Sequence, residues 1–501
     1  MATNEISESD SDSLCSSLAS LGSSMYAVPN NLLQIIFRRL SASDLCHVAC
    51  CSRWLRDATN QDSLWRPLCQ SRGWEHYGTT TDLAKIASYG PSKQATGATE
   101  ASHCSVTFQN DRIVTDDNTA GLTSTCRWKS AYMRAYHLNR NWATNCSNVK
   151  ELDINMYRPH DVFSDQAFVD GDLLAMRTSD KTVHVFDIRK DTLECVIRED
   201  APNKRGIIKI KDGVAVVSCS SGTVRAFDAR TGQMLQVMET AGQGEFISSF
   251  FDGELVIVST YDIWRYVRRD SRYIYVWGVQ DGRRRLLTMD DATEIDGWRE
   301  IDYRNKLLAA AHSDNYIRVW DARSGERLHK LKCPQGAFGV KLGDNVIVGF
   351  SADQNNALMN IICIFSLDTG ECQKEISFLS ANTWDPYLTN SLIMIVKKGR
   401  VFNSMFAYDL RGISVTRKTL KGSILHPTYT DHDNGSKFSF SVFDEEERRY
   451  KEFIFEATPM GLLRLGAFSR DLRDVEIIWM DEIRMLRYDT RHKRLLIHHY
   501  W

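Results

Sequence analysis

Four arginines gather beside a tryptophan in residues 261–272, which read YDIWRYVRRDSR. Guanidinium groups donate paired hydrogen bonds to phosphate and carboxylate oxygens. The segment therefore predicts a site for a phosphorylated or acidic group, and a solvated loop whose tryptophan packs on the fold beneath is the alternative. The candidate binding residues are Trp264, Arg265, Arg268, Arg269 and Arg272.

Other motifs with known chemistry are missing. The chain contains no Gly-x-Ser-x-Gly, no phosphate loop and no His-Glu-x-x-His. The segment AGQGEF, residues 241–246, begins like a dinucleotide-binding loop but lacks its third glycine, so we interpret it as a loop between strands. Cys46, His47, Cys50 and Cys51 cluster, but metal binding there would compete with helix packing. We predict no catalytic residue, no metal and no cofactor, the alternative being scattered residues that converge only in the fold.

Composition and charge exclude several classes of protein. The 501 residues are 43% hydrophobic and 25% charged, which is typical of a globular chain of two or three domains. Lys and Arg total 62 against 64 Asp and Glu, so no bulk charge recruits nucleic acid or a membrane surface. Apolar runs such as LIMIV are far shorter than a membrane span, and the 13 cysteines include no Cys-x-x-Cys pair. We predict an intracellular protein, cytoplasmic or nuclear, without a membrane or nucleic-acid partner.

Apolar residues recur with helical spacing in residues 28–68. In the first predicted helix one set falls at i, i+3, i+4 and i+8 and another at i, i+4 and i+7, so two adjoining faces are apolar. So short a segment has more apolar surface than it can bury by itself, and the surplus must meet another protein. The first set is Leu32, Ile35, Ile36 and Leu40, and the second is Leu33, Phe37 and Leu40.

Helix limits and further helices follow from the same stretch. Pro29 suits a first-turn position, and Ser41 and Ser43 suit the break and cap before a second helix. Asp62 or Ser63 is the predicted cap of the last helical turn. The inward residues are predicted to be Leu45, Val48 and Ala49, then Trp54 and Leu55, and finally Leu64, Trp65 and Leu68.

These residues, in this order, resemble the F-box family. The resemblance is carried by Val28-Pro29, Leu32-Leu33-x-x-Ile36, Ser41-x-x-Asp44-Leu45, Ser52-Arg53-Trp54 and Leu64-Trp65-Arg66. Val28 stands where the family has leucine, and Asn31 where an acidic residue is common. The resemblance implies docking onto a Skp-type adaptor of a cullin ubiquitin ligase. The implied adaptor-binding residues are Pro29, Leu32, Leu33, Ile36, Phe37, Leu40, Leu45, Val48, Trp54, Leu55 and Trp65.

Two segments of biased composition flank this predicted F-box, which we assign to residues 26–76. Residues 1–25 are acidic and serine-rich and predict a disordered tail, and residues 77–126 predict a linker. Residues 127–143 then predict a linker helix with one aromatic face, formed by Trp128, Tyr132, Ala135, Leu138 and Trp142. Trp128-Lys129, Tyr132 and Asn141-Trp142 resemble the element that joins F-box to propeller in F-box/WD-repeat proteins, which would set the spacing between the two.

From about residue 148 the helical spacing ends, and polar and apolar residues alternate with a period of two, which is typical of strands. The clearest unit is residues 306–331: a strand, a tight turn, a strand closing on Trp320-Asp321, a turn and another strand. Copies recur every 41 to 50 residues, close to the WD-repeat period of about 40–45. The closing aromatic residues are Phe186, Phe227, Trp277, Trp320, Phe365, Tyr408 and Phe455.

The last unit, residues 475–501, has sequence for three strands, and residues 147–156 form an orphan strand before the first full unit. A missing outer strand would expose an unpaired edge, so the orphan strand should complete the last unit. We therefore predict a WD-like propeller of eight blades over residues 147–501, with seven as the alternative. The family's Gly-His is absent, and its turn aspartate survives in places such as Asp180 and Asp314, so its structural hydrogen-bond network should be incomplete.

The resemblance to F-box/WD-repeat proteins covers about residues 30–70 and 127–501. It implies a non-catalytic substrate receptor of a Skp/cullin/F-box ubiquitin ligase, with a small all-α F-box before an all-β propeller. Long insertions, such as residues 261–272, fall between the second and third strands of a blade. In F-box/WD-repeat relatives, phosphorylated peptides bind to the face of the propeller where these connections lie. The expected target is a protein that is phosphorylated or acidic. An adaptor-bound scaffold without ubiquitin transfer is the alternative.

Overall fold

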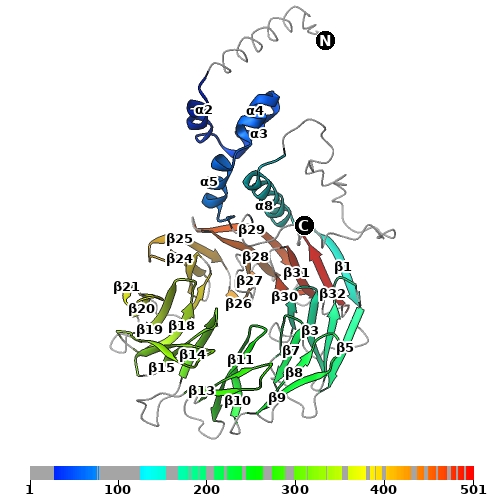
Figure 1. The fold of residues 1–501 in the computed structure, drawn as a ribbon, viewed down its shortest axis with the longest axis vertical. Helices are drawn as coiled ribbons and strands as arrows, with labels where there is room; N and C mark the ends of the chain where they lie inside the picture. Colours follow the sequence, from blue (N-terminus) through cyan, green and yellow to red (C-terminus); the bar gives the residue numbers. More distant parts are fainter. Residues whose placement is uncertain are drawn as a thin grey trace, which may run out of the picture. The chain divides into compact units, whose positions relative to one another are not determined.

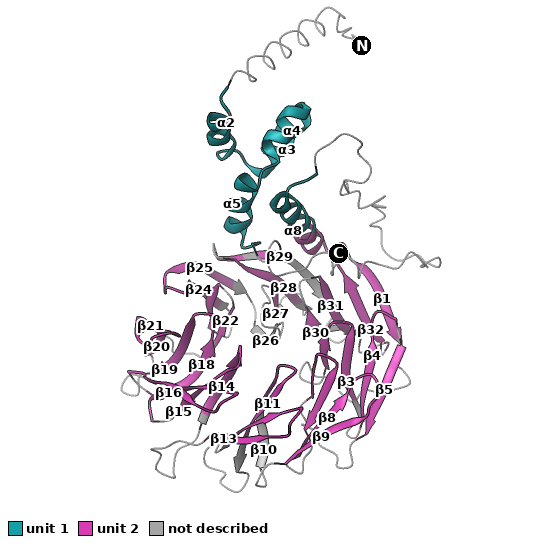
Figure 2. Cartoon of the chain, viewed as in Figure 1, with its two compact units in different colours: residues 1–85, 96–137 teal, residues 86–95, 138–501 magenta. Residues whose placement is uncertain are grey.

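The chain divides into two compact units (Figure 2). The computed structural model describes residues 28–75, 77 and 124–153 and, with short gaps between strands, residues 167–500. The first unit takes in residues 1–85 and 96–137, and its described part is helical. The second takes in residues 86–95 and 138–501 and consists mainly of strands.

Short helices make up the described part of the first unit (Figure 1). They are α2 (Asn30–Phe37), α3 (Ala42–Cys51), α4 (Arg53–Thr59) and α5 (Asp62–Arg72). A longer helix, α8 (Arg127–Thr144), contributes its residues up to His137 to this unit and the remainder to the second unit.

Serine caps set the limits of the central helices. The Ser41 hydroxyl accepts a hydrogen bond from the Asp44 backbone nitrogen (3.2 Å), and the Asp44 carboxylate accepts one from the Ser41 backbone nitrogen (3.3 Å). This capping box starts α3. The predicted cap at Ser41 is confirmed, whereas Ser43 lies inside the helix and does not cap it. The Ser52 hydroxyl likewise accepts from Leu55 at the start of α4. Helix α5 ends at Gly73, whose φ of 74° lies in the left-handed region that glycine adopts without strain.

Two predicted helix starts are wrong in detail. Pro29 is the residue before α2 and not part of its first turn. Helix α5 begins at Asp62 with Gln61 at its N-cap, so neither Asp62 nor Ser63 caps it. The Asp62 carboxylate instead accepts a hydrogen bond from the backbone nitrogen of Trp128 (3.0 Å). It therefore serves the first turn of α8, where a negative charge faces the unpaired N–H groups of the helix.

Aromatic rings form the core of the first unit. Trp65 is fully buried, and its indole nitrogen donates to the Thr59 carbonyl oxygen (2.8 Å). The Tyr132 ring packs edge-on against Trp65 and Trp74, with centroids 5.4 and 5.1 Å away. The predicted aromatic face of the long helix is confirmed, because its members Trp128, Tyr132, Ala135, Leu138 and Trp142 are all buried.

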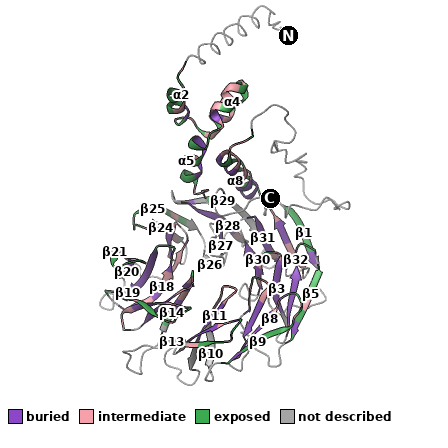
Figure 3. Cartoon of the chain, in the orientation of Figure 1, coloured by how far each residue is buried: buried purple, intermediate pink, exposed green. Residues whose placement is uncertain are grey.

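Eight four-stranded antiparallel sheets, or blades, make up the described part of the second unit (Figure 1). In the first seven blades the strands neighbour one another in chain order, and the fourth strand is an edge, which is largely exposed in β5 and β9 (Figure 3) and in β17. Blade 1 is β2 (Ala167–Asp170), β3 (Leu173–Ser179), β4 (Thr182–Asp187) and β5 (Thr192–Arg198). Blade 2 is β6 (Ile208–Lys211), β7 (Val214–Ser218), β8 (Thr223–Asp228) and β9 (Met234–Glu239). Blade 3 is β10 (Gly244–Phe251), β11 (Leu255–Asp262), β12 (Tyr273–Gly278) and β13 (Arg284–Leu287).

The next four blades repeat this order. Blade 4 is β14 (Trp298–Arg304), β15 (Leu307–His312), β16 (Tyr316–Asp321) and β17 (Arg327–Lys332). Blade 5 is β18 (Ala337–Leu342), β19 (Val346–Ala352), β20 (Met359–Ser366) and β21 (Cys372–Leu379). Blade 6 is β22 (Trp384–Leu388), β23 (Leu392–Lys397), β24 (Phe402–Asp409) and β25 (Ser414–Lys421). Blade 7 is β26 (Ser423–Tyr429), β27 (Lys437–Asp444), β28 (Arg449–Thr458) and β29 (Gly461–Arg470).

Blade 8 joins strands from opposite ends of the propeller sequence. Its order is β1 (Asn148–Asp153), β32 (Arg494–His499), β31 (Arg484–Asp489) and β30 (Val475–Met480). β1 runs antiparallel to β32, from Asn148 opposite His499 to Asp153 opposite Arg494. The predicted closure by an N-terminal outer strand is thus confirmed, with eight blades and not seven.

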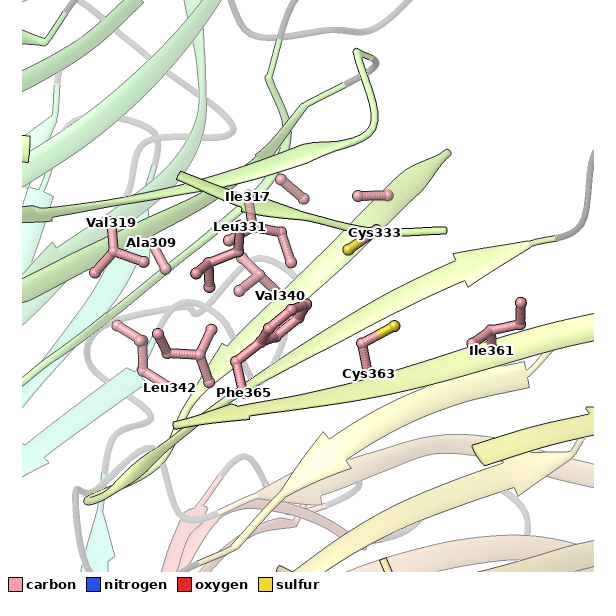
Figure 4. Packing of buried hydrophobic residues seen from close by; sticks show 13 residues of the cluster. Ala309, Ile317, Val319, Leu331, Cys333, Val340, Leu342, Ile361, Cys363 and Phe365 are labelled. Atoms are coloured by element: carbon pink, nitrogen blue, oxygen red, sulfur yellow. The ribbon is translucent and has the colours of Figure 1, made fainter. Parts of the chain in front are cut away.

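Hydrophobic clusters between neighbouring blades form the core of the propeller. Between blades 4 and 5, Ala309, Val319 and Leu331 pack with Val340 and Phe365 (Figure 4). A comparable cluster joins blade 8 to blade 1. Each large apolar side chain buried in this way contributes about 1.5–3 kcal/mol. Packing of each blade on the next therefore stabilises the ring as a whole.

A turn aspartate follows the closing aromatic residue in several blades and explains the sequence repeat. The Asp228 carboxylate accepts a hydrogen bond from the Thr231 backbone nitrogen (2.7 Å), and Asp321 accepts one from Ser324 (2.6 Å). These backbone donors are the largest cause of the lowered pKa of each carboxyl group. Gly325 completes the second turn with a φ of 78°. The closing residues Phe186, Phe227, Trp277, Trp320, Phe365, Tyr408 and Phe455 all lie in the third strand of their blades.

Asp314 organises a local network in blade 4. Its carboxylate accepts hydrogen bonds from the Tyr316 backbone nitrogen (3.1 Å) and the buried Arg318 guanidinium (2.6 Å), and it lies 2.9 Å from His312 Nδ1. These contacts hold the turn between the second and third strands of this blade. The other predicted turn aspartate, Asp180, lies outside the described residues.

A buried histidine in blade 8 makes stability depend on pH. His498 is 6% exposed, its Nδ1 lies 3.0 Å from the Ser147 hydroxyl, and its Nε2 has no hydrogen-bond partner among the described residues. Burial lowers the pKa of His498 to about 3, with smaller effects from the charges of Arg487 and His499. Protonation of this ring is therefore far easier in the unfolded chain than in the folded one.

The free energy of unfolding should consequently fall as the pH drops below the unfolded pKa of about 6.5, by about 1.4 kcal/mol per pH unit down to about 4. We expect His498→Gln to remove this contribution, which denaturant titration of the variant and the parent protein between pH 4 and 7 would measure. His47→Gln, at an exposed histidine, is the control. Equal pH dependence of the His498 variant and the parent protein would contradict the expectation.

Candidate functional site

Helix α2 has two apolar faces with different surroundings. Leu33 and Phe37 are each 1% exposed, so this face belongs to the core of the first unit. Leu32, Ile35 and Ile36 are 49%, 57% and 50% exposed, so they form an apolar stripe in water. Large apolar side chains that stay together at a surface are typical of a protein-binding site.

Backbone and side-chain contacts hold α2 in place. The Pro29 carbonyl oxygen accepts hydrogen bonds from the backbone nitrogens of Leu32 (3.0 Å) and Leu33 (3.1 Å), which starts the helix. The Gln34 side-chain amide donates to the Ala58 carbonyl oxygen of α4 (3.3 Å). With Leu33 and Phe37 buried, these contacts orient the exposed stripe.

The predicted adaptor-binding residues fall into three groups. Leu33, Phe37, Leu45 and Trp65 are buried; Pro29, Leu32 and Ile36 are exposed; Leu40, Val48, Trp54 and Leu55 are partly buried. The structure thus separates residues that stabilise the unit from residues that a partner can reach. Ile35 was not among the predicted binding residues, although its position three residues after Leu32 was a signal for the same face.

The predicted arginine site lies in the propeller sequence. Trp264, Arg265, Arg268, Arg269 and Arg272 lie outside the described residues. The flanking strands are β11 and β12, the second and third strands of blade 3, so the segment connects the strands that the repeat pattern predicted. The binding role of these five residues stays a prediction.

Comparison with known proteins identifies the helical segment. A family model described as F-box-like matches residues 25–71. This segment is an F-box-like domain. It includes α2 to α4 and most of α5, and therefore the exposed stripe Leu32, Ile35 and Ile36. A search of curated proteins returned no match.

Several solved structures match this chain over about two thirds of its length. The designed protein Ika8 matches with 14% identity over 68% of this chain and 97% of its own, with a TM-score of 0.48. The C-terminal WD40 domain of Sif2 matches with 11% identity, 70% and 98% coverage and a TM-score of 0.49. BamB from Moraxella catarrhalis matches with 13% identity, 68% and 86% coverage and a TM-score of 0.39. All three scores are below 0.5, so the fold assignment depends on the strand order of the eight sheets.

The chain combines an F-box-like domain with an eight-bladed propeller, which is consistent with an F-box/WD-repeat protein. This architecture is typical of non-catalytic adaptor and receptor proteins. Across the described residues no group of three or more His, Cys, Asp or Glu side chains is arranged to hold a metal ion. No helix in the described part of the chain is long and apolar enough to cross a membrane.

Proposed function

We propose that this chain is the substrate-recognition subunit of a Skp/cullin/F-box ubiquitin ligase. The F-box-like domain binds the Skp-type adaptor, and the propeller binds the protein to be ubiquitinated. The observation that supports the proposal most directly is the half-exposed stripe of Leu32, Ile35 and Ile36 on α2 of the F-box-like domain. An adaptor that covers this stripe removes three large apolar side chains from water.

The other predicted adaptor-binding residues act in two ways in this proposal. The buried residues Leu33, Phe37, Leu45 and Trp65 support α2 from beneath and do not touch the adaptor. The exposed Pro29 and the partly buried Leu40, Val48, Trp54 and Leu55 lie at the rim of the contact.

The receptor itself forms and breaks no bonds. Its contribution is to hold a target near the ubiquitin-conjugating enzyme, so that the transfer becomes effectively intramolecular. The target carries an acidic or phosphorylated segment, which the arginines of residues 261–272 bind through charge-assisted hydrogen bonds. Propellers offer such a surface because the loops of all blades converge on shared faces.

The double substitution Leu32→Ala/Ile36→Ala tests adaptor docking. Leu32 and Ile36 are already about half buried in the free protein, so the adaptor adds roughly half of the full burial energy for each, about 0.8–1.5 kcal/mol, and we expect the Kd for purified adaptor to rise at least about 10-fold. The melting temperature should fall by only a few degrees, since the exposed half of each side chain makes no contact in the free protein. Calorimetric titration gives the Kd. Leu328→Ala, which truncates a 44% exposed leucine of β17, is the matched control, and adaptor binding by the double variant as tight as by this control would refute docking through α2.

Affinity purification of the parent chain and of the Leu32→Ala/Ile36→Ala variant from cells distinguishes a substrate receptor from a scaffold. A receptor's targets accumulate on the intact chain when the proteasome is inhibited, and they escape degradation in cells that contain the Leu32→Ala/Ile36→Ala variant. Partners whose amounts do not respond to either treatment would identify an adaptor-bound scaffold instead.

A further inference from the structure

The exposed stripe of α2 does not end with its apolar residues. Arg39 follows Leu32, Ile35 and Ile36 with the spacing i, i+3, i+4 and i+7, which places all four on one helix face. The helical path continues beyond Phe37, because the backbone of Arg38 is helical and the Arg39 backbone nitrogen donates to the Ile36 carbonyl oxygen (3.0 Å). Arg39 therefore extends the apolar stripe with a positive charge.

The side chain of Arg39 is left for a partner outside the described residues. The residue is exposed, and across the described part of the chain its guanidinium takes part in no hydrogen bond or ion pair. Arg66, by contrast, donates to Glu75 at 2.8 Å. Arg38 is equally exposed but lies about 100° away around the helix, off the stripe.

The helix that carries the stripe has no negative charge of its own. Helix α2 contains no Asp or Glu, and Arg38 and Arg39 follow its last residue. Of the acids that follow in the first unit, Asp44 caps α3, Asp62 accepts from the Trp128 backbone, and Glu75 pairs with Arg66. A partner that covers the stripe therefore meets a positive charge at the C-terminal end of α2.

We propose that Arg39 is part of the adaptor-docking surface and that the adaptor presents an acidic side chain to it, at the edge of the apolar groove that covers Leu32, Ile35 and Ile36. This inference rests on the proposed function and adds the charge of the partner. Opposite charges at the rim of an apolar contact speed association and fix the orientation of the two proteins. The partner is thus a protein with an acidic docking face, and its association with the chain depends on ionic strength.

Charge reversal at two neighbouring arginines tests the proposal. At about 50 mM salt we expect Arg39→Glu to raise the Kd for the purified adaptor about 10-fold or more, mainly through slower association, while Arg38→Glu changes it by less than about 3-fold. The difference should shrink at about 500 mM salt, because the Debye length falls to roughly 4 Å. Both arginines lie at the C-terminal end of α2, so any loss of favourable interaction with the helix dipole affects both variants.

Surface plasmon resonance at both salt concentrations, with Leu32→Ala/Ile36→Ala on the same sensor, distinguishes the outcomes. If the apolar double variant loses the adaptor while Arg39→Glu and Arg38→Glu bind alike at low salt, the charge proposal is wrong and the docking proposal stands. If the apolar double variant binds like the parent protein, the proposed function itself fails. Should Arg39→Glu melt below Arg38→Glu, the neutral pair Arg39→Gln and Arg38→Gln replaces them, with a smaller difference in the same direction expected.

Discussion

Truncation after residue 474 should abolish folding of the propeller. The change removes β30, β31 and β32, which leaves β1 without its partner strand and exposes the apolar face of blade 1 that packs against blade 8. It also takes five large side chains out of the cluster that joins blade 8 to blade 1, at a cost of roughly 8–15 kcal/mol. That loss is as large as the whole stability of a typical domain, about 5–15 kcal/mol. The lost side chains are Trp479, Leu486, Tyr488, Leu495 and Ile497.

Circular dichroism on heating and limited proteolysis would measure the effect. We expect the truncated chain to aggregate or to be cleaved throughout the propeller without a cooperative melting transition. Deletion of residues 1–27 removes the same number of residues and no strand of the eight described sheets, so it is the control. A soluble truncated protein that melts like the parent would show that the last three strands are not needed to close the ring.

Removing one partner of a buried ion pair in blade 7 should have the second largest effect. Lys437 and Glu456 lie opposite each other on β27 and β28, with their charged groups 3.7 Å apart and side chains 0% and 2% exposed. The Asn139 side-chain amide also donates to Glu456 (2.9 Å). We expect Lys437→Met to lower the free energy of unfolding by about 3–5 kcal/mol, because it leaves a carboxylate buried without its counter-charge.

A second substitution should recover much of this loss. Lys437→Met/Glu456→Gln removes both charges and keeps an acceptor for Asn139, so we expect at least about half of the stability to return. Chemical denaturation gives these free energies. The control is Lys211→Met, which breaks the more exposed pair with Asp170 and should cost less than about 1 kcal/mol. If Lys437→Met costs no more than this control, the buried pair does not contribute as proposed.

Local patterns predicted much of the fold. Alternation of polar and apolar residues and closing aromatic residues recur from blade to blade, and turn aspartates recur in several blades; each depends on contacts within about 30 residues of chain. The outer strand β1 was predicted as well, because an unpaired edge in the last blade required a partner. The serine cap at Ser41 and the aromatic face of α8 followed from residue types and their spacing. The sequence also predicted the strands that flank residues 261–272. The binding role proposed for the arginines of this segment stays a prediction.

The sequence by itself therefore determined the helical and strand-rich regions, a repeat of about 40 to 50 residues that predicted eight blades or seven, and more apolar surface on α2 than one core can use. Only the tertiary structure decided which face of α2 is buried, because Leu33 and Phe37 differ from Leu32 and Ile36 in what packs against them and not in hydrophobicity. The fold alone also brought Asp62 to the start of α8 and buried His498. Periodicity reports which residues share a face, whereas burial and charge depend on partners that are distant in the chain.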